Sequence, residues 1–223
     1  MTIALLSDVH ANLVALEAVL AELPATEELW VMGDTVGYGP DPSDVLALLR
    51  ERGARLIAGN HDRAVATGEG LGLFNPMARA AATLHQAWLS AGERDVLAAL
   101  PLTFVGRERY LVCHGSPRDP LWEYVFDRGA AERSMASTAV PNCCNGHTHV
   151  PALLEVGDGR LMVNPGSVGQ PRDGDARAAY ALLDPDTGSV QFRRAAYDVA
   201  ETQRRMRALR LPELLADRLG YGL

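Results

Sequence analysis

The length, composition and charge of this chain are those of a folded domain, and they exclude several other classes of protein. Its 223 residues can bury a full core, and 48% hydrophobic with 22% charged residues argues against disordered and fibrous proteins. A net charge of −7, with no block of Lys and Arg, disfavours nucleic-acid partners. We therefore expect a single domain over residues 1–223.

Cysteine usage and the apolar runs indicate the compartment. Three cysteines, of which Cys143 and Cys144 are adjacent, cannot form a regular disulfide framework and include no Cys-x-x-Cys pair for structural zinc. No apolar run reaches the length of a membrane span. We expect a cytoplasmic protein with no membrane partner, signal peptide or transmembrane helix. The sequence excludes neither a monomer nor a homo-oligomer.

The first third of the chain alternates short apolar runs with helical patterns, which is typical of βαβ units and an α/β sheet. Asn12 offers an N-cap to the first helix, and Pro42 suits the first position of the second. The expected elements are strands at 3–7, 29–32 and 56–58 and helices at 13–23 and 42–52.

The middle of the chain turns helical and the second half is richer in strands. Residues 75–100 read as a helical insert that could serve as a lid, and hairpin turns are expected at 157–159 and 184–188. Connections in the second half are too short for crossover helices, so hairpins must form. We predict an α/β fold in which two mixed β-sheets pack as a sandwich flanked by helices, with the active site at one edge.

Five short segments hold nearly all of the unusual polar residues, and each directly follows an apolar, strand-like run. Because the carboxyl ends of strands in an α/β sheet converge, residues far apart in sequence can meet there. Asp8 to Asp34 and Asp34 to Asn60 are both separated by 26 positions, which fits successive βαβ units of roughly 30 residues. The segments are Asp8–His10, Gly33–Gly37, Gly59–Asp62, Cys113–Gly115 and Gly146–His149.

Histidines concentrate in these segments, which hold five of the six in the chain. For any single histidine, an ordinary interior or surface role would be the better interpretation, and we give His85 such a role on the apolar side of a helix. Five together indicate a site. The Asp-x-His and His-x-His spacings also place alternate side chains on one side of an extended backbone, so both members can reach one cavity.

In order and in kind, the five segments match the motif set of the calcineurin-like metallophosphoesterases: D-x-H, G-D-x-x-G, G-N-H-[DE], a His-Gly and G-H-x-H. The chain resembles this family over residues 8–149, and residues 37–42 and 164–172 are similar to a compact bacterial and archaeal phosphodiesterase-type subgroup. The resemblance implies one metal held by Asp8, His10 and His149, a second held by Asn60, His114 and His147, and Asp34 bridging both.

The resemblance implies a hydrolase with a dinuclear metal centre that cleaves phosphodiesters or small nucleotide-like phosphoesters by in-line attack of a metal-bridging hydroxide. Two divalent ions about 3.5 to 4 Å apart can clamp a phosphoryl oxygen and lower the pKa of a shared water. Imidazole, carboxylate and amide ligands suit Mn²⁺, Fe, Zn²⁺, Co²⁺ or Ni²⁺ better than Ca²⁺, and the metal stays open among these five.

Further side chains are candidates for catalysis and substrate binding. His61 is the candidate that would protonate or stabilise the departing oxygen. Asp62 is expected to orient the imidazole ring of His61. Arg63 and Arg172, with Asn60, are candidate contacts to the substrate phosphate, although an arginine in a loop is more often solvated.

Other functions fit parts of the pattern. The same metal core could hydrolyse phosphomonoesters, phosphoproteins or dinucleoside polyphosphates, and a chain of this length favours a small phosphoester substrate. A non-catalytic scaffold of the same fold, as in a retromer subunit, would have degraded metal positions, and here all are intact. A metallo-β-lactamase-like hydrolase needs a tight His-x-His-x-Asp-His cluster that the sequence lacks.

Overall fold

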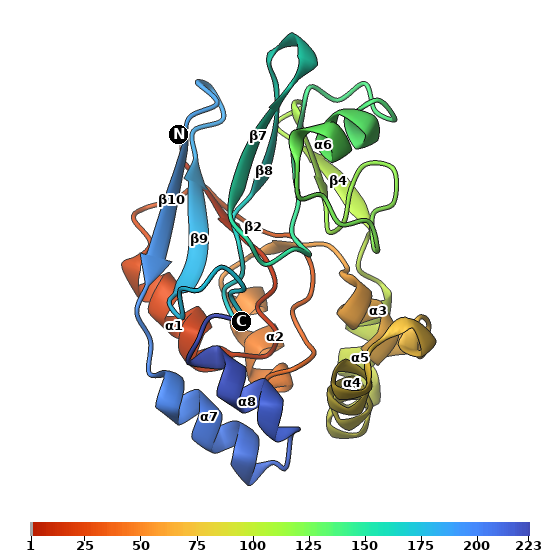
Figure 1. Ribbon diagram of the computed structural model, residues 1–223, viewed down its shortest axis with the longest axis vertical. Coiled ribbons are helices and arrows are strands. Elements are labelled where there is room, and N and C mark those ends of the chain that lie inside the picture. Colours follow the sequence, from red (N-terminus) through yellow and green to blue (C-terminus); the bar gives the residue numbers. More distant parts are fainter. Residues whose placement is uncertain (1) are drawn as a thin grey trace.

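Two five-stranded sheets and the helices around them make up the computed structural model, which describes residues 2–223, the side chain of Asp158 apart (Figure 1). The first sheet has the strand order β10-β9-β1-β2-β3 and the second β4-β5-β6-β8-β7. Both are mixed: β1 runs parallel to β2 and antiparallel to β9, while β8 runs parallel to β6 and antiparallel to β7. The fold class expected from the sequence is confirmed.

Each sheet contains three parallel strands, to which the β9–β10 hairpin adds one edge of the first sheet, while β4 and β7 pair antiparallel at the two edges of the second. The first sheet contains β1 (Ile3–Leu6), β2 (Glu28–Val31), β3 (Arg55–Leu56), β9 (Ala178–Leu183) and β10 (Val190–Ala195). The second contains β4 (Thr103–Gly106), β5 (Tyr110–Cys113), β6 (Asn142–Cys144), β7 (Ala152–Val156) and β8 (Arg160–Asn164).

In Figure 1, α1, α2, α7 and α8 gather below and beside the first sheet and α3, α4 and α5 form a second group, while α6 lies apart beside the second sheet. Short 3₁₀ turns lie at Leu71–Leu73 and Gly157–Gly159. None of the helices within residues 2–223 combines the length and the apolar character needed to cross a membrane. The helices are α1 (Leu13–Glu22), α2 (Pro42–Glu51), α3 (Asn60–Thr67), α4 (Pro76–Trp88), α5 (Ala91–Ala98), α6 (Arg128–Met135), α7 (Val199–Ala208) and α8 (Glu213–Leu219).

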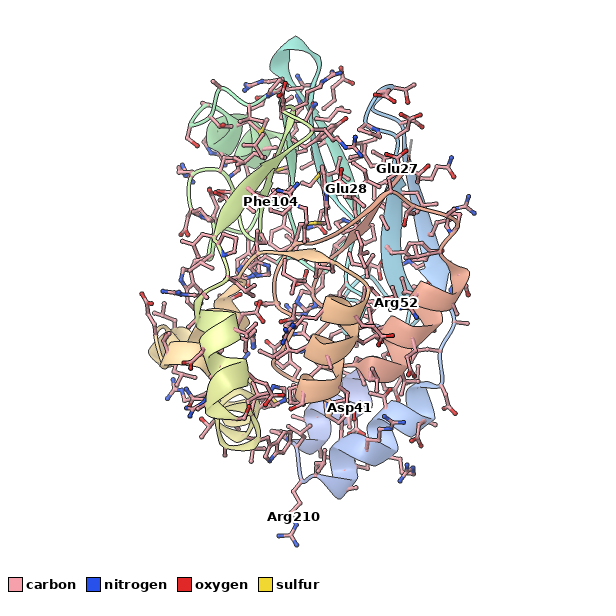
Figure 2. All side chains as sticks on the ribbon, turned by 180° about the vertical axis from the view of Figure 1, so that it is seen from behind. Glu27, Glu28, Asp41, Arg52, Phe104 and Arg210 are labelled. Atoms are coloured by element: carbon pink, nitrogen blue, oxygen red, sulfur yellow. The ribbon has the colours of Figure 1, made fainter. Side chains whose placement is uncertain are left out.

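A shared apolar core lies between the two sheets. Ile3 and Trp30 of the first sheet pack with Tyr110 and Val163 of the second, all essentially inaccessible to solvent. At the back of the molecule, Figure 2 shows Phe104 of the second sheet, which meets the Trp30 ring edge to face at 5.5 Å. The sheets are therefore fixed face to face, and this fixes the relative positions of the loops at their ends.

Helix α1 shows how the sequence builds this arrangement. The side chain of Asn12 accepts a hydrogen bond from the backbone nitrogen of Ala15 at 3.2 Å, which satisfies one free donor at the helix start. Leu16, Val19 and Leu20 then lie on one buried face. The amide of Asn12 also donates to the carbonyl of Gly169 at 3.0 Å, so the same residue joins α1 to a loop beside the site.

Candidate metal centre

The polar segments come together where β1, β2, β5 and β6 end and where α3 begins. Asp8 and Asp34 each follow a strand of the first sheet by two or three residues, and His114 directly follows β5 of the second. Asn60 is the first residue of α3, a helix that the sequence pattern did not predict. The structure therefore brings side chains from both sheets to one place.

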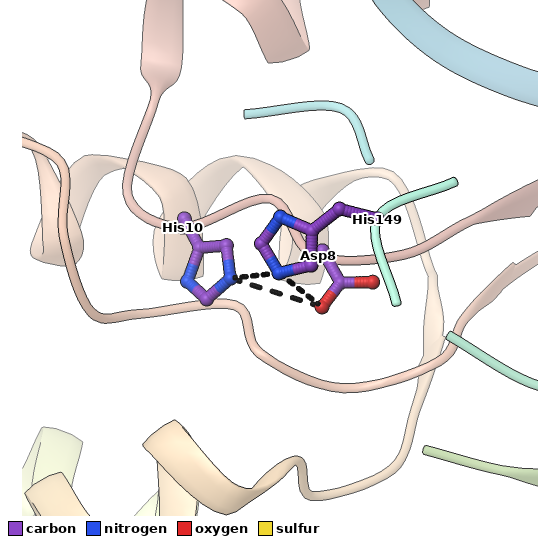
Figure 3. A group of neighbouring side chains, drawn as sticks. All are labelled: Asp8, His10 and His149. Atoms are coloured by element: carbon purple, nitrogen blue, oxygen red, sulfur yellow. Dashed lines mark hydrogen bonds and ion pairs between the residues drawn. The ribbon is translucent and has the colours of Figure 1, made fainter. Parts of the chain in front are cut away.

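Asp8, His10 and His149 form the first candidate group, which Figure 3 shows in close-up. One donor atom from each lies within 4.8 Å of the others, and all three residues are buried. Nε2 of His149 is 3.2 Å from Oδ1 of Asp8 and 3.1 Å from Nε2 of His10. Oδ2 of Asp8 accepts hydrogen bonds from Ser7 Oγ at 2.6 Å and from His147 N at 3.0 Å. Although burial acts against it, the pKa of Asp8 lies well below its usual range, so Asp8 is a carboxylate.

Hydrogen bonds to the backbone fix which ring nitrogen carries the proton in this group. Nδ1 of His10 is 3.0 Å from the carbonyl of Val36, and Nδ1 of His149 is 2.6 Å from the carbonyl of Gln170. A carbonyl only accepts, so each Nδ1 must be the donor. Burial lowers the pKa of both imidazoles, which are therefore neutral, and their Nε2 atoms carry lone pairs.

Three acceptors thus face one another with no proton between them. The two Nε2 lone pairs, 3.1 Å apart, point toward Oδ1 of Asp8, a buried oxygen that has no hydrogen-bond partner among the described residues. Buried acceptors of this kind are costly unless something positive satisfies them. A cation is the group that this arrangement fits.

Asp34, His114 and His147 form the second candidate group, with Asn60 beside it. Nε2 of His114 lies 3.0 Å from Oδ1 of Asn60, 3.0 Å from Nδ1 of His147 and 3.4 Å from Oδ2 of Asp34. Its Nδ1 again faces a backbone carbonyl, that of Met32, at 2.8 Å. Burial lowers the pKa of His114, but Asp34 outweighs it and raises that pKa to about 10, so this position strongly favours positive charge.

Asp34 also connects the two groups. Its Oδ2 is 3.4 Å from Nε2 of His114 and 3.7 Å from Nε2 of His10, while its Oδ1 accepts a hydrogen bond from the backbone nitrogen of His61 at 2.8 Å. One carboxylate therefore reaches toward both groups. The donor set of imidazole, carboxylate and amide suits divalent transition metals, so the residues present fit a pair of such ions.

Five of the seven predicted ligands have a left-handed backbone, with φ of 52° at Asp8, 47° at His10, 52° at Asp34, 69° at His147 and 60° at His149. Asp and His tolerate this region better than most residues, but each such position still costs on the order of 1 kcal/mol or more. Hydrogen bonds between the loops hold the conformation, including His10 N to the carbonyl of Asp34 at 2.9 Å.

A family model of the calcineurin-like phosphoesterase superfamily domain matches residues 1–188 of the chain. The chain belongs to this family. The family expected from the motifs is confirmed, and this calcineurin-like phosphoesterase is accordingly a hydrolase that acts on phosphoester bonds.

Several relatives resemble this phosphoesterase over its whole length. A metallophosphoesterase from Sphaerobacter thermophilus is 41% identical with a TM-score of 0.89 over 100% of both chains. A hypothetical protein from Pyrococcus horikoshii has the same fold, with a TM-score of 0.91 at 22% identity over 100% of this chain and 98% of its own. An uncharacterized protein from Methanocaldococcus jannaschii is 31% identical over 240 aligned positions, 99% of this chain and 98% of its own.

Relatives with a named activity match a smaller part of the chain. A symmetrical bis(5'-nucleosyl)-tetraphosphatase from Erwinia tasmaniensis is 32% identical over 142 positions, which cover 59% of this chain and 50% of that enzyme. The phosphoesterase thus aligns with about half the length of that tetraphosphatase.

His61 lies at the edge of the centre, packed between aromatic rings. Its ring is 4.3 Å from that of Phe74, nearly parallel to it, and 4.5 Å from that of Tyr38. Its Nδ1 is buried and has no hydrogen-bond partner among the described residues. Burial lowers the pKa of His61 to about 4. The free ring is therefore neutral at pH 7.

No hydrogen bond among the described residues joins Asp62 to the ring of His61, which we expected it to orient. Oδ1 of Asp62 accepts from Thr35 N at 2.9 Å, Thr35 Oγ1 at 2.6 Å and Val36 N at 3.1 Å, and Oδ2 accepts from Gly59 N at 2.9 Å. Both oxygens of Asp62 are therefore engaged by the backbone and by the Thr35 hydroxyl. Burial raises the pKa of Asp62 to about 6, which leaves it ionised at neutral pH. Its observed contacts hold the loop that carries Asp34.

A cavity of about 280 Å³ opens over the two groups. Arg172 lines it, as expected of a phosphate contact, but Arg63 does not. Arg63 instead donates to the carbonyl of Ala98 at 3.2 Å and pairs with Glu69, because the unpaired carbonyls at the end of α5 attract a cation. The cavity is lined by Asp34, Tyr38, Asn60, His61, Leu73, Phe74, Asn75, Ala78, Trp122, Tyr124, His147, His149 and Arg172.

His85 of α4 ties the helical segment to the loop beside His61. Its Nδ1 accepts from Gly37 N at 3.0 Å, and its Nε2 donates to the carbonyl of Gly39 at 2.8 Å. Gly37 has a φ of +89°, and a Cβ there would stand 2.2 Å from Nδ1 of His61, so only glycine fits. The interior role expected for His85 is thus a contact with this loop, and Ala78 of the same helix lines the cavity.

Proposed function

We propose that this calcineurin-like phosphoesterase binds two divalent metal ions and uses them to hydrolyse phosphodiesters or small nucleotide-like phosphoesters. The observation that carries the proposal is the pair of facing Nε2 lone pairs of His10 and His149, 3.1 Å apart over an unpartnered oxygen of Asp8. Asp8, His10 and His149 would hold one ion, Asn60, His114 and His147 the other, and Asp34 both.

Different residues of the chain take different roles in the proposed reaction. Bound ions would supply an activated water and neutralise charge on the phosphoryl oxygens. Arg172, at the cavity wall, binds and orients the phosphate, and Asn60 contributes from the start of α3. His61 donates a hydrogen bond or a proton to the departing oxygen. Asp62 positions the loop of Asp34 rather than touching substrate.

A second candidate is the hydrolysis of dinucleoside polyphosphates. It is supported by the tetraphosphatase relatives, one of which is 32% identical over 59% of this chain. Phosphomonoesters and phosphoproteins have no comparable support. The metal is proposed to be Mn²⁺, Fe, Zn²⁺, Co²⁺ or Ni²⁺, with manganese as the first to test, because the donor set mixes nitrogen and oxygen atoms without thiolate.

The proposal includes the setting of the enzyme. We infer a single domain over residues 1–223 and a cytoplasmic location. The location is supported by Cys113 and Cys143, whose sulfur atoms lie 3.5 Å apart without a disulfide, as suits a reducing compartment.

Metal reconstitution tests the proposal directly. The protein would be stripped with a chelator, reloaded with each of the five metals and analysed for metal content, then assayed on bis(p-nitrophenyl) phosphate, p-nitrophenyl phosphate, mononucleotides and diadenosine tetraphosphate. We expect about two ions per chain and metal-dependent hydrolysis of diesters or of the tetraphosphate. A protein that binds no metal, or that hydrolyses none of these, would refute it.

A further inference from the structure

An exposed apolar rim borders the cavity. We define the rim as Leu73, Trp122, Tyr124 and Phe126. Leu73 is 72% exposed, Tyr124 48% and Phe126 65%, whereas Trp122 is partly buried. Leu73, Trp122 and Tyr124 line the cavity, and Phe126 stacks against Tyr124. Large apolar side chains left in water around a cleft mark a site for a ligand or partner.

The rings of the rim continue outward from the candidate metal centre. Tyr124 stacks on His147 with ring centroids 3.8 Å apart and an interplanar angle of 21°. Phe126 lies nearly parallel to Tyr124, at 5.7 Å and 3°. Across the cavity, Trp122 meets Phe74 edge to face at 5.9 Å. Tyr124 and Phe126 thus form a stack that continues outward from the His147 ring, and a planar aromatic group at the cavity can extend this stack or pack on the rings of Trp122 and Phe74.

Polar groups beside the rim suit a phosphate attached to that planar group. Arg172 lines the same cavity, and its buried Nε has no hydrogen-bond partner among the described residues. The guanidinium carbon of Arg172 lies 5.8 Å from the ring centroid of Tyr38, which lines the same cavity, and one of its NH2 groups donates to Oε1 of Gln170 at 2.9 Å. A cavity of about 280 Å³ is at the small end for ligand sites, so it matches one nucleotide unit better than a peptide or polymer segment.

We propose that the rim binds the base of a nucleoside that is esterified to the reacting phosphorus, so that the substrate is a small nucleotide phosphoester and not a phosphoprotein or sugar phosphate. The inference rests on the proposed function, because it assumes that phosphorus reacts at the metal centre. Stacking on one aromatic side chain typically changes affinity roughly 5- to 100-fold.

Two esters with the same leaving group test the proposal. Thymidine 5'-(p-nitrophenyl phosphate) and methyl p-nitrophenyl phosphate both release p-nitrophenolate and differ only in the retained group. We expect kcat/KM of the metal-loaded enzyme to favour the thymidine ester by roughly 5- to 100-fold. Phe126→Ser and Leu73→Ser, at two side chains that are 65% and 72% exposed, should lower this ratio, as should Tyr124→Ser. Tyr124→Phe, which keeps the ring, should hold the ratio within about 3-fold of the original.

Phe192→Ser on β10 is the matched control, because Phe192 is also a solvent-exposed phenylalanine, at 40%, but lies in the first sheet outside the cavity lining. It should leave the ratio unchanged. A second measurement compares adenosine 5'-monophosphate with ribose 5-phosphate as inhibitors: the base should strengthen inhibition, and the rim variants should erase the difference.

The outcomes separate the two proposals. If neither ester is hydrolysed with any of the five metals, the proposed function falls. If both esters are hydrolysed but with equal kcat/KM, or if rim variants slow both by the same factor, only the assignment of the rim is overturned. A rim-dependent change of oligomeric state in sedimentation, with the ester ratio unchanged, would assign the rim to contact between copies of the chain instead.

Discussion

The floor and the rim of the cavity differ in how their side chains are held. We define the floor as the seven predicted ligands, of which Asp34, Asn60, His147 and His149 line the cavity and the other three lie behind them. None is more than 4% exposed, and three of the histidines are fixed by backbone carbonyls of Val36, Gln170 and Met32. The rim is held by ring contacts, and three of its four side chains are at least 48% exposed. We therefore expect the floor residues to determine the reaction. Substitutions in the rim should change which ligand binds without disturbing the fold.

Removing the carboxylate that links both halves of the floor should have the largest effect. Asp34→Ala deletes the oxygen that lies 3.7 Å from His10 and 3.4 Å from His114, so we expect loss of both metals and at least about a 10³-fold fall in kcat/KM. His10→Ala should chiefly affect one site. Metal analysis checks this, and two ions still bound per Asp34→Ala chain would reject a bridging role.

His61 stands between the two regions, and its loss should act on the reaction without acting on metal content. His61→Ala should retain two ions yet lose roughly 10² to 10⁴ in kcat with alkyl leaving groups, and much less with p-nitrophenolate, which needs little protonation. Equal losses with both leaving groups would mean that His61 only orients phosphate or stabilises charge. Loss of metal would make it a ligand.

Metal addition should raise the Tm of the protein, and this rise should depend on the predicted ligands of the floor and not on the rim. At a free metal concentration of 100 times Kd, a site present only in the folded state adds about 2.7 kcal/mol, or roughly 5 to 10 °C in Tm for a chain of this size. Calorimetry of the stripped and reloaded protein should show this shift in the wild type and in Phe126→Ser, and not in Asp34→Ala. A smaller shift in Phe126→Ser would contradict the separation of floor and rim.

The smallest expected effect concerns a side chain that supports the floor. Asp62→Asn turns one acceptor into a donor facing Gly59 N or the amides of Thr35 and Val36, which should cost about 1 to 3 kcal/mol in the free energy of unfolding. Asp44→Asn, at an exposed position on α2, should change it by less than about 0.5 kcal/mol. Urea denaturation measures both, and equal values would show that the four hydrogen bonds of Asp62 contribute nothing.

The sequence predicted those helices whose buried face is apolar and failed for those whose buried face carries polar residues of the site. Helix α1 was predictable because Leu16, Val19 and Leu20 repeat on one face. Helix α3 was not, because three of its buried residues, Asn60, His61 and Asp62, are polar and read as a motif instead of an apolar face. Helix α6 was missed for a related reason: Arg128–Met135 contains few apolar residues.

The candidate site was likewise predictable in part. The sequence placed the seven predicted ligands on strand ends, and the structure brings them within reach of two centres; their role as ligands stays a prediction. The orientation of Asp62 and the contact of Arg63 with α5 depend on rotation around α3 and on a helix end distant in sequence. The rim was not predictable, because Leu73 is distant in sequence from Trp122 and Tyr124 and comes to the same cavity only through the tertiary fold.

The left-handed backbone at five predicted ligands lowers the free energy of unfolding of this enzyme. Glycine at Asp8, His10 or His149 would relax the chain and at the same time delete a donor atom. A substitution at each of these positions is therefore expected to raise the stability of the protein while it abolishes the activity. A stabilised variant chosen without an activity screen would be expected to collect its changes here first, and an engineer seeking thermal tolerance should hold these positions constant.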